Sequence, residues 1–158
     1  MTPFERMARL ADRMFDRMRD ERAFDVGEAD AVVGDFESLR GRTYAVLVTF
    51  RRSGEAVPSP VWIGVDGSGK AYVKTRRDAG KVKRIRNDDR ALVAPSNARG
   101  KATGPAVRAR ARVLPKEEWP HAEATLTSAY GAGRRISERL VGGPDDLAAY
   151  VELTPASS

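Results

Sequence analysis

The chain has 158 residues, of which 41% are hydrophobic and 32% are charged, a composition typical of one soluble globular domain and too apolar for wholesale disorder. It contains no cysteine and one histidine, which excludes disulfides, thiol nucleophiles, thiolate metal sites and clusters of histidine ligands. A net charge of +6 favours an anionic partner such as a phosphorylated cofactor, an acidic metabolite or nucleic acid, although abundant arginine also occurs without such a role.

No apolar run approaches the ~20 residues needed to cross a bilayer. The N-terminus mixes acidic residues with arginines and lacks the continuous apolar stretch of a secretory signal. We therefore expect a cytoplasmic protein with no membrane partner.

Residues 2–20 have the pattern of an amphipathic helix, with Thr2 as N-cap, Pro3 at the first helical position and Glu5 completing a capping box. Its apolar residues recur three and four positions apart and form one stripe: Phe4, Met7, Leu10, Ala11, Met14, Phe15 and Met18. The stripe indicates either a helix docked on its own domain, which we favour, or a seam for a partner helix or a second subunit.

Composition divides the chain into three parts. Residues 1–35 are expected to form the N-terminal helix and a linker, because 21–35 are acidic and interrupted by glycine. Strand patterns and turns fill 36–155, which we expect to be the main domain. Residues 156–158 are expected to be a disordered tail.

Short runs of β-branched and aromatic residues, separated by Gly, Pro and Asp turns, predict antiparallel strands. The expected strands cover 44–50, 57–65, 70–75, 91–95, 106–114 and 147–153. Helices are expected over about 78–87, from 116 to about 130, and near 134–140. Five or six strands with one helix inserted mid-sheet predict a mainly β fold with helices (α+β), a closed or split antiparallel β-barrel.

The segment after the strand ending at Thr75 has the pattern of an anion site at the start of a helix. Asp78 is expected to cap this helix, and Gly80 would let an anion approach the unpaired N–H groups of its first turn. Lys81, Lys83 and Arg84 would add charge-assisted hydrogen bonds to the same anion. The alternative is a solvated basic helix face.

Two prolines interrupt the strand expected at 57–65. Pro58 and Pro60 remove two hydrogen-bond donors, which indicates a sheet edge or a bulge. Such an edge would leave carbonyls and the Ser59 N–H for a planar heterocycle, with Trp62 packed beside it. The alternative is a barrel corner with a core tryptophan.

No constellation of catalytic residues stands out. His121 has no carboxylate or serine at a recognisable spacing and is interpreted as a surface histidine, so an enzyme here would need a cofactor for its chemistry. Arg108, Arg110 and Arg112 share one strand face that a nucleic-acid backbone could contact. Few aromatic residues are available for base stacking, which makes nucleic-acid binding the less favoured reading.

In their order and spacing, these features resemble the pyridoxamine 5'-phosphate oxidase-like (PPOX) FMN-binding split-barrel family, and more narrowly its F420-dependent (deazaflavin) oxidoreductase branch. The resemblance covers roughly residues 39–114, with a looser likeness through 150–153. The matching pieces are Tyr44–Phe50, the Gly54 turn, Pro58–Ile63, Ala71–Thr75, Gly80–Asn87, and Arg99–Lys101 before Ala109–Val113.

The resemblance implies a homodimer with two cofactor sites at its interface. By position it implies that Thr75 and Lys81 contact the phosphate, with Lys83 and Arg84 as helpers. It also implies that Ser59, Pro60, Val61 and Trp62 form the strand whose backbone flanks the cofactor ring. The branch uses coenzyme F420, where relatives use FMN, so the implied function is hydride transfer to an unsaturated small organic substrate. The alternatives are an FMN flavoprotein, an F420-sequestering protein without turnover, and a nucleic-acid-binding barrel.

Overall fold

The computed structural model describes residues 30–137 and 147–157, with backbone only over 130–137. The helix expected over 2–20 lies outside the described residues, as does the end of the helix expected near 134–140. In the described part of the chain, no helix is both long enough and apolar enough to cross a membrane.

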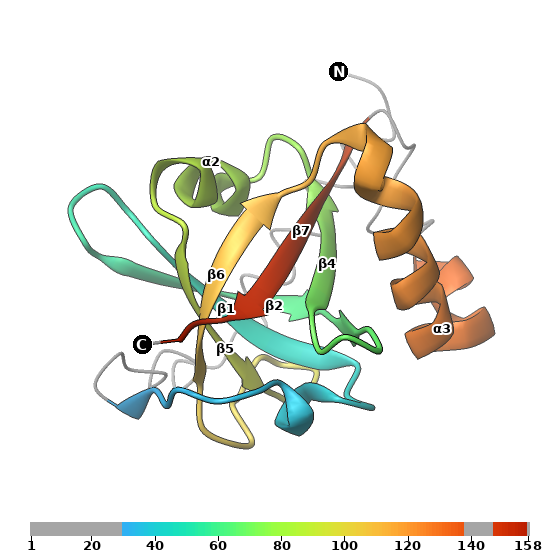
Figure 1. The fold of residues 1–158 in the computed structure, drawn as a ribbon, viewed down its shortest axis with the longest axis horizontal. Coiled ribbons are helices and arrows are strands. Elements are labelled where there is room, and N and C mark those ends of the chain that lie inside the picture. The colour runs from blue at the N-terminus through green and yellow to red at the C-terminus, as the bar shows by residue number, and fades with distance from the viewer. Residues whose placement is uncertain (1–29, 138–146, 158) are drawn as a thin grey trace.

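Seven antiparallel strands form one sheet that curls into a half-barrel (Figure 1). They are β1 (Tyr44–Phe50), β2 (Ala56–Trp62), β3 (Gly64–Val65), β4 (Ala71–Arg76), β5 (Arg90–Pro95), β6 (Val107–Val113) and β7 (Ala148–Pro155). Their order in the sheet is β2-β1-β5-β6-β7-β4-β3, so β2 and β3 form the two edges. β2 also approaches β4, which brings the two ends of the sheet together. The expected antiparallel split-barrel architecture is confirmed, and the strand expected at 57–65 is divided into two.

Alternate side chains of the strands fill the barrel interior. β6 shows the pattern most clearly, because its valine and alanines at 107, 109 and 111 are buried, whereas its arginines at 108, 110 and 112 point outward. The interior core combines residues from six strands and the segment before β1, among them Phe36, Leu39, Leu47, Val61, Ile63, Val73, Val93, Val151 and Leu153.

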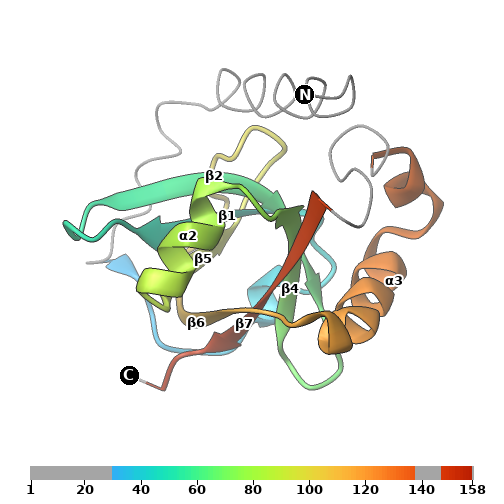
Figure 2. The ribbon, with the colours of Figure 1, turned by 90° about the horizontal axis from the view of Figure 1, so that it is seen from above.

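The α-helices of the described residues, α2 and α3, lie on separate sides of the sheet (Figure 2). α2 (Gly80–Asn87) follows β4, buries Val82 and Ile85, and packs on β1 and β6. The 3-10 helix η4 (Lys116–Glu118) leads into α3 (Trp119–Ser137), which packs on β3 and β4. One long helix, α3, therefore stands where two were expected.

Backbone hydrogen bonds to β6 and to the loop before it extend beyond both ends of the main domain, which was expected to cover 36–155. The Val32 N–H donates to the Ala106 carbonyl and the Val32 carbonyl accepts from Arg108 N–H, both at 2.9 Å, so part of the expected linker lies alongside β6. A 3-10 turn, η3 (Glu37–Leu39), follows. At the other end, the Ala156 N–H donates to the Arg108 carbonyl at 2.9 Å.

Candidate functional site

Three of the residues predicted to bind an anion lie where β4 leads into α2. They form a group, together with a threonine of β1, that is here called the basic mouth: Thr49, Thr75, Lys81 and Arg84. Lys81 Nζ donates to Thr75 Oγ1 at 3.2 Å. Arg84 Nε donates to Thr49 Oγ1 at 2.7 Å, and Thr49 on β1 is fully buried. Lys81 and Arg84 lie three positions apart on α2, so they share one face of the helix. The mouth therefore joins two threonine hydroxyls to an ammonium and a guanidinium group, and Thr49 is a member that the sequence patterns missed.

The N-terminus of α2 carries no side-chain cap. Its N-cap residue is Ala79, which makes no side-chain capping hydrogen bond. The expected cap by Asp78 is wrong, because Arg76 binds that carboxylate in a bidentate pair with distances of 3.0 and 2.7 Å. The first turn itself contains no acidic residue, so its amides and its partial positive charge are suited to an anion.

Gly80 makes room for Arg84 over the first turn of α2. A Cβ built on Gly80 would lie 2.7 Å from Arg84 Nη1 and 3.6 Å from Cζ, well inside van der Waals contact. The guanidinium group thus lies where any larger residue at position 80 would place its side chain. Lys83, by contrast, is exposed and lies on a different face of α2 from Lys81, so the structure separates it from the other cations.

The prolines of β2 lie at a sheet edge, as predicted. Ile63 N–H donates to Thr43 O, and because hydrogen-bonded pairs alternate in an antiparallel ladder, Ser59 N–H points toward its partner Leu47 on β1. The expectation that the Ser59 N–H is available to a ligand is therefore wrong. The outward edge presents the carbonyls of Pro58 and Pro60, with no N–H on either residue, and so accepts hydrogen bonds along this stretch.

The four residues predicted to flank a ring share this strand but divide between its two faces. Val61 joins the interior core, and Ser59 faces the same side, with its Oγ 3.5 Å from the Leu47 carbonyl. Pro60 and Trp62 face outward, where the Trp62 ring meets Tyr44 edge-on at 6.1 Å between centroids. The common feature of these residues is thus the backbone edge of β2.

The basic mouth is linked to β2 through β1. Val57 at the start of β2 lies opposite Thr49 in the β1–β2 register, and Thr49 is the hydroxyl that holds Arg84.

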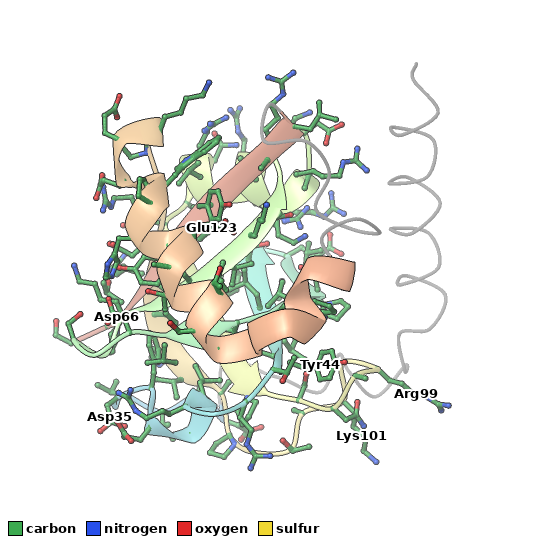
Figure 3. The ribbon with its side chains drawn as sticks, turned by 90° about the vertical axis from the view of Figure 1, so that its right-hand side faces the viewer. Asp35, Tyr44, Asp66, Arg99, Lys101 and Glu123 are labelled. Atoms are coloured by element: carbon green, nitrogen blue, oxygen red, sulfur yellow. The ribbon has the colours of Figure 1, made fainter. Side chains whose placement is uncertain are left out.

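A second polar cluster lies between the β3–β4 hairpin and α3, around Asp66 (Figure 3). Asp66 Oδ1 accepts from the amides of Ser68 (2.9 Å) and Lys70 (3.0 Å) and from Ser68 Oγ (2.7 Å). Its Oδ2 lies 2.8 Å from His121 Nε2. Burial alone would raise the pKa of Asp66, but the hydrogen bonds from His121, Ser68 and Lys70 outweigh it and hold that pKa well below its usual range. His121 lies at the surface, as expected, with a side chain that is 62% exposed, but it has a carboxylate partner 55 residues away that no sequence spacing indicated.

Tyr72 links Asp66 to a second buried carboxylate. Its hydroxyl lies 3.3 Å from both Asp66 Oδ2 and Glu152 Oε2, although one hydroxyl proton serves one acceptor at a time. Burial and the two negative neighbours raise the pKa of Tyr72, so the phenol keeps its proton. A cavity of about 740 Å³ opens over this cluster and is lined by Asp66, Lys70, Tyr72, Glu118, His121 and Glu152.

The outward arginines of β6 are engaged by carboxylates. Arg110 Nη1 lies 2.6 Å from Asp89 Oδ1. Arg112 pairs with Glu118 at 2.7 Å and with Glu152 at 3.2 Å. Among the described residues, no group of three His, Asp or Glu side chains is arranged to hold a metal ion.

Comparison with solved structures finds the same fold in several proteins. A flavin adenine dinucleotide (FAD)-binding protein from Mesorhizobium loti is 12% identical with a TM-score of 0.57, over 77% of this chain and 86% of that one. HutZ, the heme storage protein of Vibrio cholerae, is 15% identical with a TM-score of 0.56, over 74% of this chain and 84% of that one. A protein of unknown function from Agrobacterium tumefaciens is 19% identical with a TM-score of 0.54 over 73% of this chain, which spans 49% of that protein.

No family profile matches the chain, and no curated protein matches it. At identities below 20%, the structural likenesses show the fold alone, which is a split antiparallel β-barrel.

Proposed function

We propose that this protein is an oxidoreductase that binds a phosphorylated, flavin-type cofactor, with coenzyme F420 as the cofactor and FMN as the alternative. The observation that carries the proposal is the start of α2, which has no side-chain cap and where Lys81 bonds to Thr75 and Arg84 bonds to Thr49. A phosphate at the helix start would account for this feature, and a heterocycle at the edge of β2 would account for the acceptors there.

Each group at the mouth has a defined task in this proposal. Lys81 and the amides of the first turn of α2 hold the phosphate, and Thr75 orients the Lys81 ammonium. The buried Thr49 hydroxyl fixes Arg84 over the same turn. The carbonyls of Pro58 and Pro60 accept from the N–H of an imide-like ring and so orient it.

The cofactor, when bound, supplies the hydride chemistry, and the chain supplies binding, orientation and electrostatics. The side chains described at the mouth are two hydroxyls, an ammonium and a guanidinium group, and none of them is a histidine or a carboxylic acid, the side chains that most often donate a proton in catalysis. We therefore assign the proton that accompanies the hydride to solvent or to a tyrosine.

F420 is favoured over FMN because its phospholactyl-oligoglutamate tail is polyanionic and the chain carries a net charge of +6. The resemblance to the deazaflavin branch points the same way. In that branch the site lies between two subunits, so we also propose a homodimer, to be measured by sedimentation. A sequestering protein without turnover would bind the same cofactor and fail to oxidise or reduce any substrate.

Nucleic-acid binding is disfavoured by the pairing of Arg110 and Arg112 with carboxylates. Each such pair would have to break before its arginine could contact a phosphate. A steep fall of oligonucleotide affinity with salt would support that reading.

Haem binding is a second candidate, and His121 is the observation that favours it. Asp66 holds His121 Nε2, and an imidazole held in this way presents its other nitrogen to a metal. The His121 side chain is 62% exposed and borders the cavity. The same cavity is lined by Glu117, Glu118 and Glu152, which would repel haem propionates, so we favour a flavin-type cofactor.

A titration panel tests the proposal. Deazaflavin fluorescence, FMN fluorescence and the haemin absorption band are each followed as protein is added. We expect deazaflavin to bind, and Lys81→Ala to weaken binding by roughly 1.5–3 kcal/mol, the cost of a lost charge-assisted hydrogen bond. Arg86→Ala, which removes one exposed positive charge from the same helix, is the matched control. Unchanged affinity in Lys81→Ala would refute the phosphate assignment, and haemin binding that His121→Ala abolishes would favour the second candidate.

A further inference from the structure

β1 is apolar on both of its faces. Ala45 and Leu47 fill the barrel interior, whereas Val46, Val48 and Phe50 point outward. With residues of β5 and of the loop before β6, the outward side chains form one cluster, here called the outer apolar face: Val46, Val48, Phe50, Leu92, Ala94 and Ala106. All six are at most 6% exposed. A strand that is apolar on both faces needs a covering layer on each.

The described residues supply a small apolar part of this covering layer, and the Arg90 guanidinium also lies over the Phe50 ring, 5.0 Å from its centre. Ala31 and Ala102 are the partly buried apolar side chains that pack on the outer apolar face from the described part of the chain. Each contributes one methyl group, whereas a fully buried core residue touches about 6–12 others. Larger apolar side chains are therefore required to cover two valines, a leucine and a phenylalanine.

The chain enters the described structure at this face. Ala31 packs on it, and Val32 pairs with β6 directly afterwards. The segment of 29 residues that precedes Asp30 is therefore attached beside the outer apolar face. They include the apolar stripe of 2–20, and the intervening residues 21–29 could span up to ~30 Å, which leaves the stripe free to reach any part of the face.

We propose that residues 2–20 dock as an amphipathic helix on the outer apolar face of their own chain. A 19-residue helix is about 28 Å long, and a seven-residue strand about 23 Å, so the stripe spans the length of β1. The stripe is rich in methionine and phenylalanine, side chains that fill the uneven surface between neighbouring strands.

The docked helix has a consequence for assembly. The outer apolar face would otherwise be the most apolar surface of the sheet and a natural contact for a second copy. With 2–20 in place, self-association must use other surfaces. The inference concerns a different face of β1 from Thr49 and does not depend on the cofactor.

A single thiol can test this docking, because the natural chain has no cysteine. Ala94→Cys places the thiol on the outer apolar face, where Ala94 is 0% exposed, and Ala91→Cys places it in the barrel interior, where Ala91 is 2% exposed. Each is combined in the full chain with Met14→Lys, which puts a charge in the stripe, or with Asp16→Lys, which puts the same residue on the opposite side of the expected helix. The reaction rate with a chromogenic disulfide reagent is measured without cofactor.

We expect Met14→Lys to accelerate the reaction at position 94 by at least about tenfold and Asp16→Lys by less than about twofold, with position 91 slow in both. Equal rates in the two lysine variants would overturn the proposal. So would a rate at position 94 that rises on dilution in the chain with natural residues 2–20, because a second copy would then be the cover. If Met14→Lys also exposes position 91, Met14→Gln and Asp16→Gln replace the lysine pair, and equal rates there overturn the proposal as well. Failure of docking would leave cofactor affinity unchanged, so it is distinguishable from failure of the proposed function.

Discussion

We expect Gly80→Ala to lower the affinity for the cofactor much more than it changes the free energy of unfolding. The added Cβ would meet Arg84 Nη1 at 2.7 Å, too close for any real contact. Because Nη1 is the end of a flexible side chain, the guanidinium moves and the backbone does not. We expect Arg84 to leave the first turn of α2 and to weaken or lose its 2.7 Å bond to Thr49.

The two consequences differ in size. Alanine in place of glycine reduces the conformational entropy of the unfolded chain and so stabilises the fold by about 0.4–1 kcal/mol, which offsets much of a partly buried Arg84–Thr49 bond worth about 1.5 kcal/mol. The free energy of unfolding should therefore change by less than about 1 kcal/mol. Loss of one charge-assisted contact to the ligand should weaken binding by about 1.5–3 kcal/mol, or roughly ten- to 150-fold.

Urea unfolding and deazaflavin titration, run on the same samples, measure the two effects. Gly34→Ala is the matched control, because a Cβ on Gly34 meets no atom within 4 Å. If Gly80→Ala binds the cofactor as tightly as the natural chain, Arg84 does not contact the ligand from the first turn of α2 and the reasoning fails.

Three further substitutions test neighbouring features. The pKa of Asp66 is lower in the folded protein than in the unfolded chain, where it is near 4. The ionised carboxylate therefore stabilises the fold at pH values above about 4, and this stabilisation is lost as the pH falls toward the pKa of the folded state. Asp66→Asn should therefore lose about 2 kcal/mol at pH 7 and show a flatter decline of stability below pH 4 in urea titrations at stepped pH, whereas a parallel decline would contradict the assignment. In Gly64→Ala, the new Cβ would lie 3.3 Å from the Ala129 Cβ and from the Thr125 carbonyl oxygen of α3, so the free energy of unfolding should fall by about 1 kcal/mol in the same assay. Gly67→Ala is the control and should lower it by less, because a Cβ there meets no atom within 4 Å. Thr49→Val should weaken cofactor binding severalfold by releasing Arg84, and an unchanged affinity would show that the Thr49 hydroxyl does not position the guanidinium.

The features that short-range patterns predicted are those that depend on neighbours in the chain. Alternation within β6 identified its inner face, because side chains of one strand must alternate whatever the strand packs against. Thr75 and Lys81 meet across a single strand–helix turn of six residues. The prolines of β2 identified an edge for the same local reason, since neither can donate to a ladder.

The errors arose where two local preferences compete or where register decides. Asp78 is a good cap by residue type, but Arg76 two positions away offers it a bidentate pair, and an Asp bound in this way does not turn to the helix. The direction of the Ser59 N–H depends on its pairing with Leu47, and a slip of one residue would reverse it. Residue types alone contain no information on that register.

The Asp66 cluster could not be predicted from the sequence because its members lie far apart along the chain. Asp66 and His121 are 55 residues apart, and Tyr72 and Glu152 are 80 apart, so only the β4–β7 pairing and the crossing of α3 bring them together. Asp66 also has the sequence context of an ordinary turn residue, and it does hold the turn through Ser68 and Lys70. Its second carboxylate oxygen, Oδ2, joins that turn to α3 through His121, a contact that the sequence did not predict. β4 then carries Tyr72 outward toward this cluster and Thr75, three residues later, toward the basic mouth. Because the two side chains leave opposite faces of one strand, changes at Asp66 or His121 should alter the seating of α3 while the Lys81–Thr75 contact stays intact.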